Sequence, residues 1–150
     1  MTSTVTRIAI AAPAQNVYAL ASATERWPIL LPHYRFVRVL SVDGDVRTVE
    51  MAARRGRIPI RWIAEQRNDP HKPSIFFRHI AGWTKGMEVE WRFAERGGET
   101  IVSISHSLDF TFPIAAAFIE KHVIADYFID GVAKQTLAQF KRLAEENVPV

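Results

Sequence analysis

The period of the hydrophobic pattern changes along this chain, and that change constrains the fold more than any other feature of the sequence. Between Arg35 and Phe110, apolar residues recur mainly at every second position, as in strands with one buried face. From Pro113 to about Glu146 they recur at spacings of three and four, as in an amphipathic helix. Because both elements must bury an apolar face, the pattern predicts an α+β fold in which a sheet packs on a long C-terminal helix.

Turn residues divide the period-two region into strands. Residues 43–45 and 97–98 are glycine-containing hairpin turns, and residues 68–70 end a further strand. The predicted strands cover residues 35–42, 46–53, 58–66, 74–81, 86–94 and 100–110. Short turns between consecutive strands indicate an antiparallel sheet.

The first 31 residues add one more strand and two short helices. Residues 4–10 alternate as a first strand, residues 14–23 are predicted to be helical after Pro13, and residues 24–31 form a second short helix. The chain shows no repeat, linker or break in composition, so we expect residues 1–150 to form one domain. The expected architecture is a curved, antiparallel seven-stranded sheet wrapped around the long helix. This arrangement encloses an internal cavity.

Several function classes are excluded by what the sequence lacks. It contains no cysteine, and therefore no disulfide, thiolate metal site or cysteine nucleophile. It has no G-x-S-x-G, G-x-G-x-x-G or P-loop motif, and its five histidines do not have metal-binding spacings, so we expect no metal and no other cofactor. The longest uncharged apolar run, residues 112–119, is much shorter than a bilayer span of about 20 residues. We therefore expect a cytoplasmic protein.

The net charge of +3 arises from an arginine-rich region between residues 35 and 78. Such a region could contact phosphates of nucleic acid or anionic lipid. The simpler interpretation is a solvated sheet face, and neither a recognition helix nor an RNA-binding aromatic motif accompanies the charge. We therefore expect no nucleic-acid partner. An exposed edge strand would allow a homodimer, so the sequence leaves monomer and homodimer open.

Large aromatic side chains recur along the chain, and they suit a plain core or a pocket for a flat ligand equally well. The four tryptophans are Trp27, Trp62, Trp83 and Trp91. Strand alternation predicts two inward faces, one with Trp62, Ala64 and Gln66 and the other with Met87, Val89, Trp91 and Phe93. The strand over residues 74–81 is ambiguous. Either its inward face carries Phe76, Arg78 and Ile80, or it carries Phe77, His79 and Ala81.

Several segments of the chain resemble the START-type polyketide cyclase and lipid-transport superfamily, which has the helix-grip fold. They are V-Y-A-L at 17–20, E-R-W-P at 25–28, L-P-H-Y at 31–34, the hairpin M-E-V-E-W-R-F at 87–93 with G-G-E-T at 97–100, and A-Q-F-K-R-L at 138–143. The pattern is similar to the aromatase/cyclase domains of bacterial aromatic polyketide synthesis. Those domains bind a poly-β-ketone chain and direct an aldol condensation and dehydration to an aromatic ring.

The resemblance implies three catalytic side chains: Tyr34, Arg78 and His106. Tyr34 would donate to the reacting oxygen, and Arg78 or Gln66 would hold the enolate. His106 would act as a base, or His79 if its strand face points inward. With the strand and helix faces, the resemblance also implies the substrate-binding side chains Trp27, Trp62, Gln66, Phe77, His79, Met87, Trp91, Phe118 and His122. One departure is material. Where those cyclases carry a serine and an arginine after the inward tryptophan, this chain has Ala64 and Gln66.

Two functions therefore remain open, and with them whether the chain is an enzyme. The first is an aromatase/cyclase that acts on a hydrophobic, aromatic or polyketide-like molecule. The second is a non-catalytic lipid or quinone carrier of the coenzyme Q-binding type, which the missing serine and arginine favour. Either function implies a small hydrophobic ligand. The partners to be expected besides it are an acyl carrier protein or an anionic membrane surface.

Overall fold

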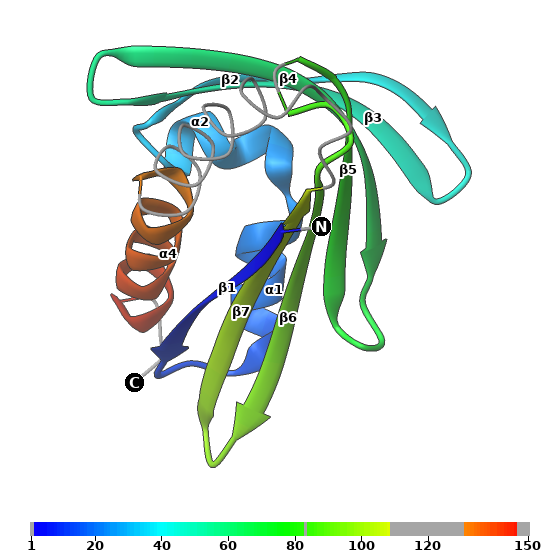
Figure 1. Ribbon diagram of the computed structural model, residues 1–150. Coiled ribbons are helices and arrows are strands. Elements are labelled where there is room, and N and C mark those ends of the chain that lie inside the picture. Colours follow the sequence, from blue (N-terminus) through cyan, green and yellow to red (C-terminus); the bar gives the residue numbers. More distant parts are fainter. Residues whose placement is uncertain (1, 83, 109–130, 147–150) are drawn as a thin grey trace.

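A strongly curved antiparallel sheet dominates the computed structural model, which describes residues 2–82, 84–108 and 131–146 (Figure 1). The strand order is β1-β7-β6-β5-β4-β3-β2, and each neighbouring pair is antiparallel. The strands are β1 (Thr2–Ile10), β2 (Tyr34–Asp43), β3 (Val46–Arg55), β4 (Ile58–Asp69), β5 (Ser74–Gly82), β6 (Glu88–Arg96) and β7 (Glu99–Leu108). This architecture confirms the predicted seven-stranded sheet.

Short helices separate β1 from β2, as predicted. They are α1 (Ala14–Ser22), the 3-10 helix η1 (Thr24–Arg26) and α2 (Trp27–Leu30). Pro28 lies in the first turn of α2, where the missing N–H removes no intrahelical hydrogen bond. The described part of the C-terminal helix is α4 (Lys134–Glu146). A π-helical turn at residues 131–133 comes directly before it. The rest of the predicted long helix lies outside the described residues. Within the described part, no helix is long and apolar enough to cross a membrane.

The sheet bends around α4, so that the β2–β3–β4 half crosses above the β1–β7–β6 half (Figure 1). Register shifts in β2 and between Ile63 and Ala64 of β4 mark where strands bend. Gly82 sits where β5 meets this bend. Its φ is +104°, and a Cβ there would lie 2.9 Å from the backbone oxygen of Arg61. A side chain at position 82 would therefore push β5 away from Trp62, which pairs with Gly82 in the ladder.

The core lies on the concave face of the sheet. The burial pattern of β5 shows which of its two faces points toward that core. Phe77 and His79 are buried, whereas Arg78 and Ile80 are exposed. The structure thus resolves the ambiguity of this strand in favour of the Phe77 and His79 face. The other inward faces are as predicted at Trp62 and Trp91, which are both buried.

Candidate functional site

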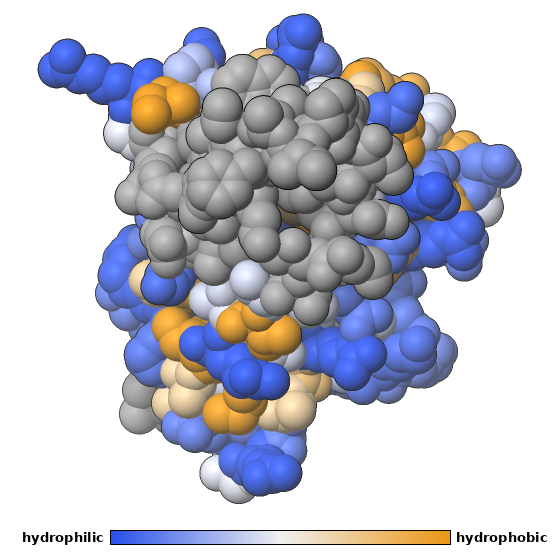
Figure 2. Space-filling model, viewed as in Figure 1, coloured by the Kyte–Doolittle hydropathy of each residue, from blue (hydrophilic) through white to orange (hydrophobic). Residues whose placement is uncertain are grey.

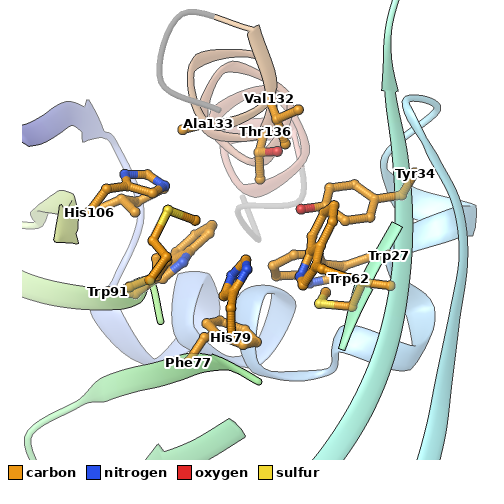
Figure 3. A pocket seen from close by; sticks show the side chains of 14 residues that line it. Trp27, Tyr34, Trp62, Phe77, His79, Trp91, His106, Val132, Ala133 and Thr136 are labelled. Carbon is orange, nitrogen blue, oxygen red and sulfur yellow. The ribbon is translucent and has the colours of Figure 1, made fainter. Parts of the chain in front are cut away.

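A cavity lies between the concave face of the sheet and the beginning of α4 (Figure 3). Its volume is about 40 Å³. Since drug-sized ligands occupy pockets of about 300–1,000 Å³, a ring system can enter only if lining side chains move apart. The described residues that line it are Trp27, Tyr34, Met51, Trp62, Phe77, His79, Met87, Val89, Trp91, Ile104, His106, Val132, Ala133 and Thr136.

Most of the predicted site residues meet in this cavity. Eight of them are in its lining: Trp27, Tyr34, Trp62, Phe77, His79, Met87, Trp91 and His106. Phe118 and His122 lie outside the described residues. The sequence analysis did not assign Met51, Val89, Ile104, Val132, Ala133 or Thr136 to the site, although strand alternation and the spacing of the C-terminal helix place several of them on inward faces.

Trp27 packs against several of the aromatic rings around the cavity. Its ring centroid lies 4.9 Å from that of Tyr34, in an edge-on arrangement, and 5.7 Å from that of Trp91. The indole Nε1 donates a hydrogen bond of 3.1 Å to the backbone oxygen of Ala21 at the end of α1. This bond satisfies the one polar atom of a side chain that is otherwise buried in apolar contacts. Trp27 therefore couples the short helices to the sheet.

His79 and Trp62 form a stacked pair on the cavity wall, with centroids 5.5 Å apart and an interplanar angle of 6°. His79 Nδ1 lies 2.6 Å from Thr84 Oγ1, and both side chains are buried. The turn between β5 and β6 brings Thr84 back toward His79, since the amide of Gly86 donates to the backbone oxygen of His79 at 2.9 Å. Residue 84 lies between the predicted strands 74–81 and 86–94 and outside the predicted site. No local pattern signals this contact.

The two histidines of the cavity are neutral at pH 7. Burial lowers the pKa of His106 to about 4. Burial, and secondarily the charge that His106 would carry, lowers the pKa of His79 to about 3. His106 Nδ1 is buried and has no hydrogen-bond partner among the described residues. Neutral imidazoles can accept or donate hydrogen bonds, so these rings offer polar contacts to a ligand without bringing a positive charge.

Tyr34, the first residue of β2, turns its hydroxyl into the cavity (Figure 3). Its ring stands edge-on to that of Trp62, with centroids 6.1 Å apart. The neighbouring His33 joins this end of the sheet to α4, because His33 Nε2 lies 2.7 Å from Thr136 Oγ1. Burial lowers the pKa of His33 to about 4, against the opposing effect of the Val132 backbone oxygen. The hydrogen bond between His33 and Thr136 therefore joins the sheet side of the cavity to its α4 side.

The structure corrects the placement of Arg78. Its side chain is exposed on the outer face of β5, where it lines a surface groove together with Arg67 and Glu90. Successive side chains of a strand point to opposite faces, so the buried position of His79 excludes Arg78 from the cavity. The hypothesis that Arg78 holds an enolate there is therefore wrong. None of the described residues in the cavity lining is an arginine, lysine, aspartate or glutamate.

Gln66 points inward as predicted, but it does not line the cavity. Its Oε1 accepts hydrogen bonds from the Thr24 hydroxyl at 2.8 Å and from Arg47 Nη2 at 3.2 Å. Its Nε2 donates to Asn68 Oδ1 at 2.8 Å and to the backbone oxygen of Ser22 at 3.3 Å. The predicted substrate contact is therefore wrong. The amide instead ties the short helices that carry Trp27 to β3 and β4.

We expect Gln66→Ala to lower the free energy of unfolding by about 1–3 kcal/mol, because it leaves buried partners such as the Thr24 hydroxyl without a bond. Ligand affinity should change little, since the amide is outside the cavity. Urea denaturation and ligand titration of the same variant test both statements. Gln135→Ala, at an exposed position of α4, is the matched control and should stay within about 0.5 kcal/mol of the parent. A large loss of affinity in a folded Gln66→Ala variant would contradict this assignment.

A curved sheet wrapped around a C-terminal helix, with an aromatic cavity between them, defines the helix-grip class of small-molecule-binding proteins. The chain belongs to the family described as polyketide cyclase / dehydrase and lipid transport, which matches residues 10–126.

Solved structures agree with this fold. A protein of Thermus thermophilus has a TM-score of 0.80 at 20% identity, over 98% of this chain and 100% of the other. The Zhui aromatase/cyclase of a Streptomyces species has a TM-score of 0.80 at 16% identity, over 99% and 96%. A START superfamily protein of Mycobacterium smegmatis has a TM-score of 0.73 at 16% identity, over 94% and 98%. At these identities the similarity establishes the fold.

Proposed function

We propose that this protein binds a flat, hydrophobic molecule, aromatic or polyketide-like, in the cavity between the sheet and α4. The observation that carries the proposal is the composition of the cavity wall. Three tryptophans provide ring surfaces, while Tyr34, His79 and His106 add a few polar atoms. Apolar walls with a small number of positioned polar groups are characteristic of ligand sites. The family and the aromatase/cyclase fold similarity support the same ligand class.

The proposal extends to an aldol cyclisation followed by dehydration. The cavity would fold the substrate so that a nucleophilic carbon meets one carbonyl, and this orientation supplies most of the rate enhancement. His106 accepts the proton from that carbon, the new carbon–carbon bond forms, and Tyr34 donates a hydrogen bond to the oxygen that becomes negative. His106 then returns the proton to that oxygen, which becomes a hydroxyl. In the dehydration, His106 removes the second proton from the same carbon and passes it to the hydroxyl, which leaves as water as the carbon–carbon double bond forms. A histidine with a lowered pKa is a strong acid once protonated, which favours this return.

A non-catalytic carrier of a lipid or quinone is the second candidate. The observation that favours it is the uncharged cavity lining, in which none of the described residues supplies the cation that would polarise a carbonyl. Placing Arg78 outside the cavity strengthens this candidate relative to the sequence analysis. An acyl carrier protein would be the partner of the cyclase, and an anionic membrane surface that of the carrier.

A tryptophan-fluorescence titration with a polyphenolic polyketide mimic and a prenylated quinone tests the proposal, because Trp27, Trp62 and Trp91 line the cavity. We expect saturable quenching by the polyphenol. Loss of a hydrogen bond of about 1–1.5 kcal/mol in Tyr34→Phe should weaken its binding about tenfold. Tyr18→Phe is the control, because Tyr18 contacts Phe93 and is not part of the cavity lining.

A turnover assay distinguishes the cyclase from the non-catalytic carrier. If the protein is a cyclase, Tyr34→Phe should also lower the rate of cyclisation of a poly-β-ketone mimic, by about 10²-fold or more. Quenching by the quinone alone, without cyclisation, would favour the carrier. The absence of quenching by either ligand would show that the aromatic rings are packed core and would refute the proposed function.

A further inference from the structure

The turn between β3 and β4 carries a cluster of positive charge that the cavity does not use. We call residues 54–61 the hairpin tip; its sequence is R-R-G-R-I-P-I-R. No acidic residue occurs between Glu50 and Glu65. Arg54, Arg57 and Arg61 are exposed. The turn between β3 and β4 lies at a projecting end of the sheet (Figure 1).

Among the described side chains of the hairpin tip, Arg61 alone forms an ion pair, and it shares its partner. Arg61 Nε lies 3.7 Å from Glu50 Oε2, and the same carboxylate also contacts Arg38 at 3.4 Å, so one acid serves two arginines. Arg54 and Arg57 form no ion pair with any residue in the described part of the chain. With Arg54 and Arg57 unpaired among the described residues, the hairpin tip presents a positive potential to its surroundings.

The hairpin tip also exposes an apolar side chain among its arginines. Ile58 follows Arg57 directly and is 61% exposed. Figure 2 shows apolar atoms beside a projecting hydrophilic side chain at the upper left, where the hairpin ends in Figure 1. The amide of Arg54 donates to the backbone oxygen of His33 at 2.8 Å, so the tip adjoins the segment that follows α2. In α2, Ile29 is 80% exposed. An exposed isoleucine next to an arginine suits a lipid interface, because the isoleucine can enter the acyl chains while the arginine stays among the headgroups.

We propose that the hairpin tip docks on an anionic lipid bilayer, with Arg54 and Arg57 at the lipid phosphates and Ile58 inserted among the acyl chains. The choice of a bilayer as partner rests on the carrier candidate of the proposed function, because a lipid or quinone ligand concentrates in membranes. The same strands connect the two surfaces: β3 and β4 carry Met51 and Trp62 into the cavity and the arginines to the tip. Docking at the tip thus brings the strands of the cavity wall to the lipid surface.

Vesicle flotation of the full chain without added ligand tests this proposal. We expect binding to phosphatidylcholine vesicles that contain about 30% phosphatidylglycerol, weak binding to pure phosphatidylcholine, and release as salt rises from about 0.1 M to about 0.5 M. The double variant Arg54→Gln, Arg57→Gln should lower the partition coefficient about 30-fold, because each arginine near an anionic surface contributes about fivefold. Ile58→Ser should lower it several-fold, and this loss should persist at every salt concentration, since it removes apolar contact.

The matched control is Arg7→Gln, Arg96→Gln, which removes the same charge from exposed positions outside the tip. It should keep most of the binding. Equal losses in the two double variants would show a nonspecific effect of net charge and overturn the proposal. So would an absence of binding to anionic vesicles at low salt, or binding of an acidic carrier protein in place of vesicles. The fluorescence titration of the Arg54→Gln, Arg57→Gln variant reports on the cavity separately, so failure of docking and failure of ligand binding are distinguishable.

Discussion

Replacing Trp27 with alanine should lower the free energy of unfolding by about 4 kcal/mol, the largest expected effect of a single substitution in this protein. The indole is 2% exposed and fills the space between α1, the sheet and α4. Its ring lies 6.1 Å from Phe77 of β5 and 6.1 Å from Phe140 of α4, in addition to its contacts with Tyr34 and Trp91. Truncation therefore opens a void that rigid strands on one side cannot close. Equilibrium urea denaturation measures the loss.

Trp27→Phe separates the ring contacts from the hydrogen bond to Ala21. It keeps an aromatic ring in the same space and should cost about 1–2 kcal/mol, because it gives up some volume and the bond from Nε1. The alanine variant should also bind the polyphenol more weakly than the phenylalanine variant does. If Trp27→Ala loses less than about 1 kcal/mol, Trp27 does not join the helices to the sheet.

Acid should destabilise the protein strongly, and the two cavity histidines should account for much of the effect. The pKa of each is lowered in the folded state, to about 4 for His106 and about 3 for His79, from 6.5 in the unfolded chain. The unfolded state thus binds more protons below about pH 6.5. The stability that the neutral rings contribute is complete above that pH. It is lost as the pH falls from 6.5 toward the folded values, and the loss is complete below them.

Between pH 7 and pH 5 each ring should lose about 2 kcal/mol of stability, or about 4 kcal/mol for the pair. His33, with a pKa also lowered by burial, acts in the same direction. Urea denaturation at both pH values measures the difference. The variant His79→Gln, His106→Gln should retain much less pH dependence, even though its stability at pH 7 is lower. His71→Gln alters an exposed side chain and should keep the full loss. A parent whose stability is flat from pH 7 to pH 5 would contradict the burial of uncharged rings.

The sequence alone determined which face of most strands points inward. The period-two pattern placed Trp62 on the inner face of β4 and Met87 and Trp91 on the wall formed by β6, because alternation in a strand is a local property that no distant contact can reverse without a bulge. The helical spacing after Pro113 likewise predicted the element that covers the sheet. The Trp27 and Tyr34 assignments came from the resemblance, and both side chains reach the cavity.

The tertiary structure decided the features that depend on residues far apart in the chain. Both faces of strand β5 carry apolar residues, so its sequence does not show which face is buried. Packing on the helices decides this, and it buries His79 and exposes Arg78. Gln66 was correctly placed inward. Its partner Thr24, however, is 42 residues away, and that contact, rather than the strand pattern, removes its amide from the cavity. Alternation fixes a side chain's direction, whereas the partner it meets depends on how the whole sheet curves.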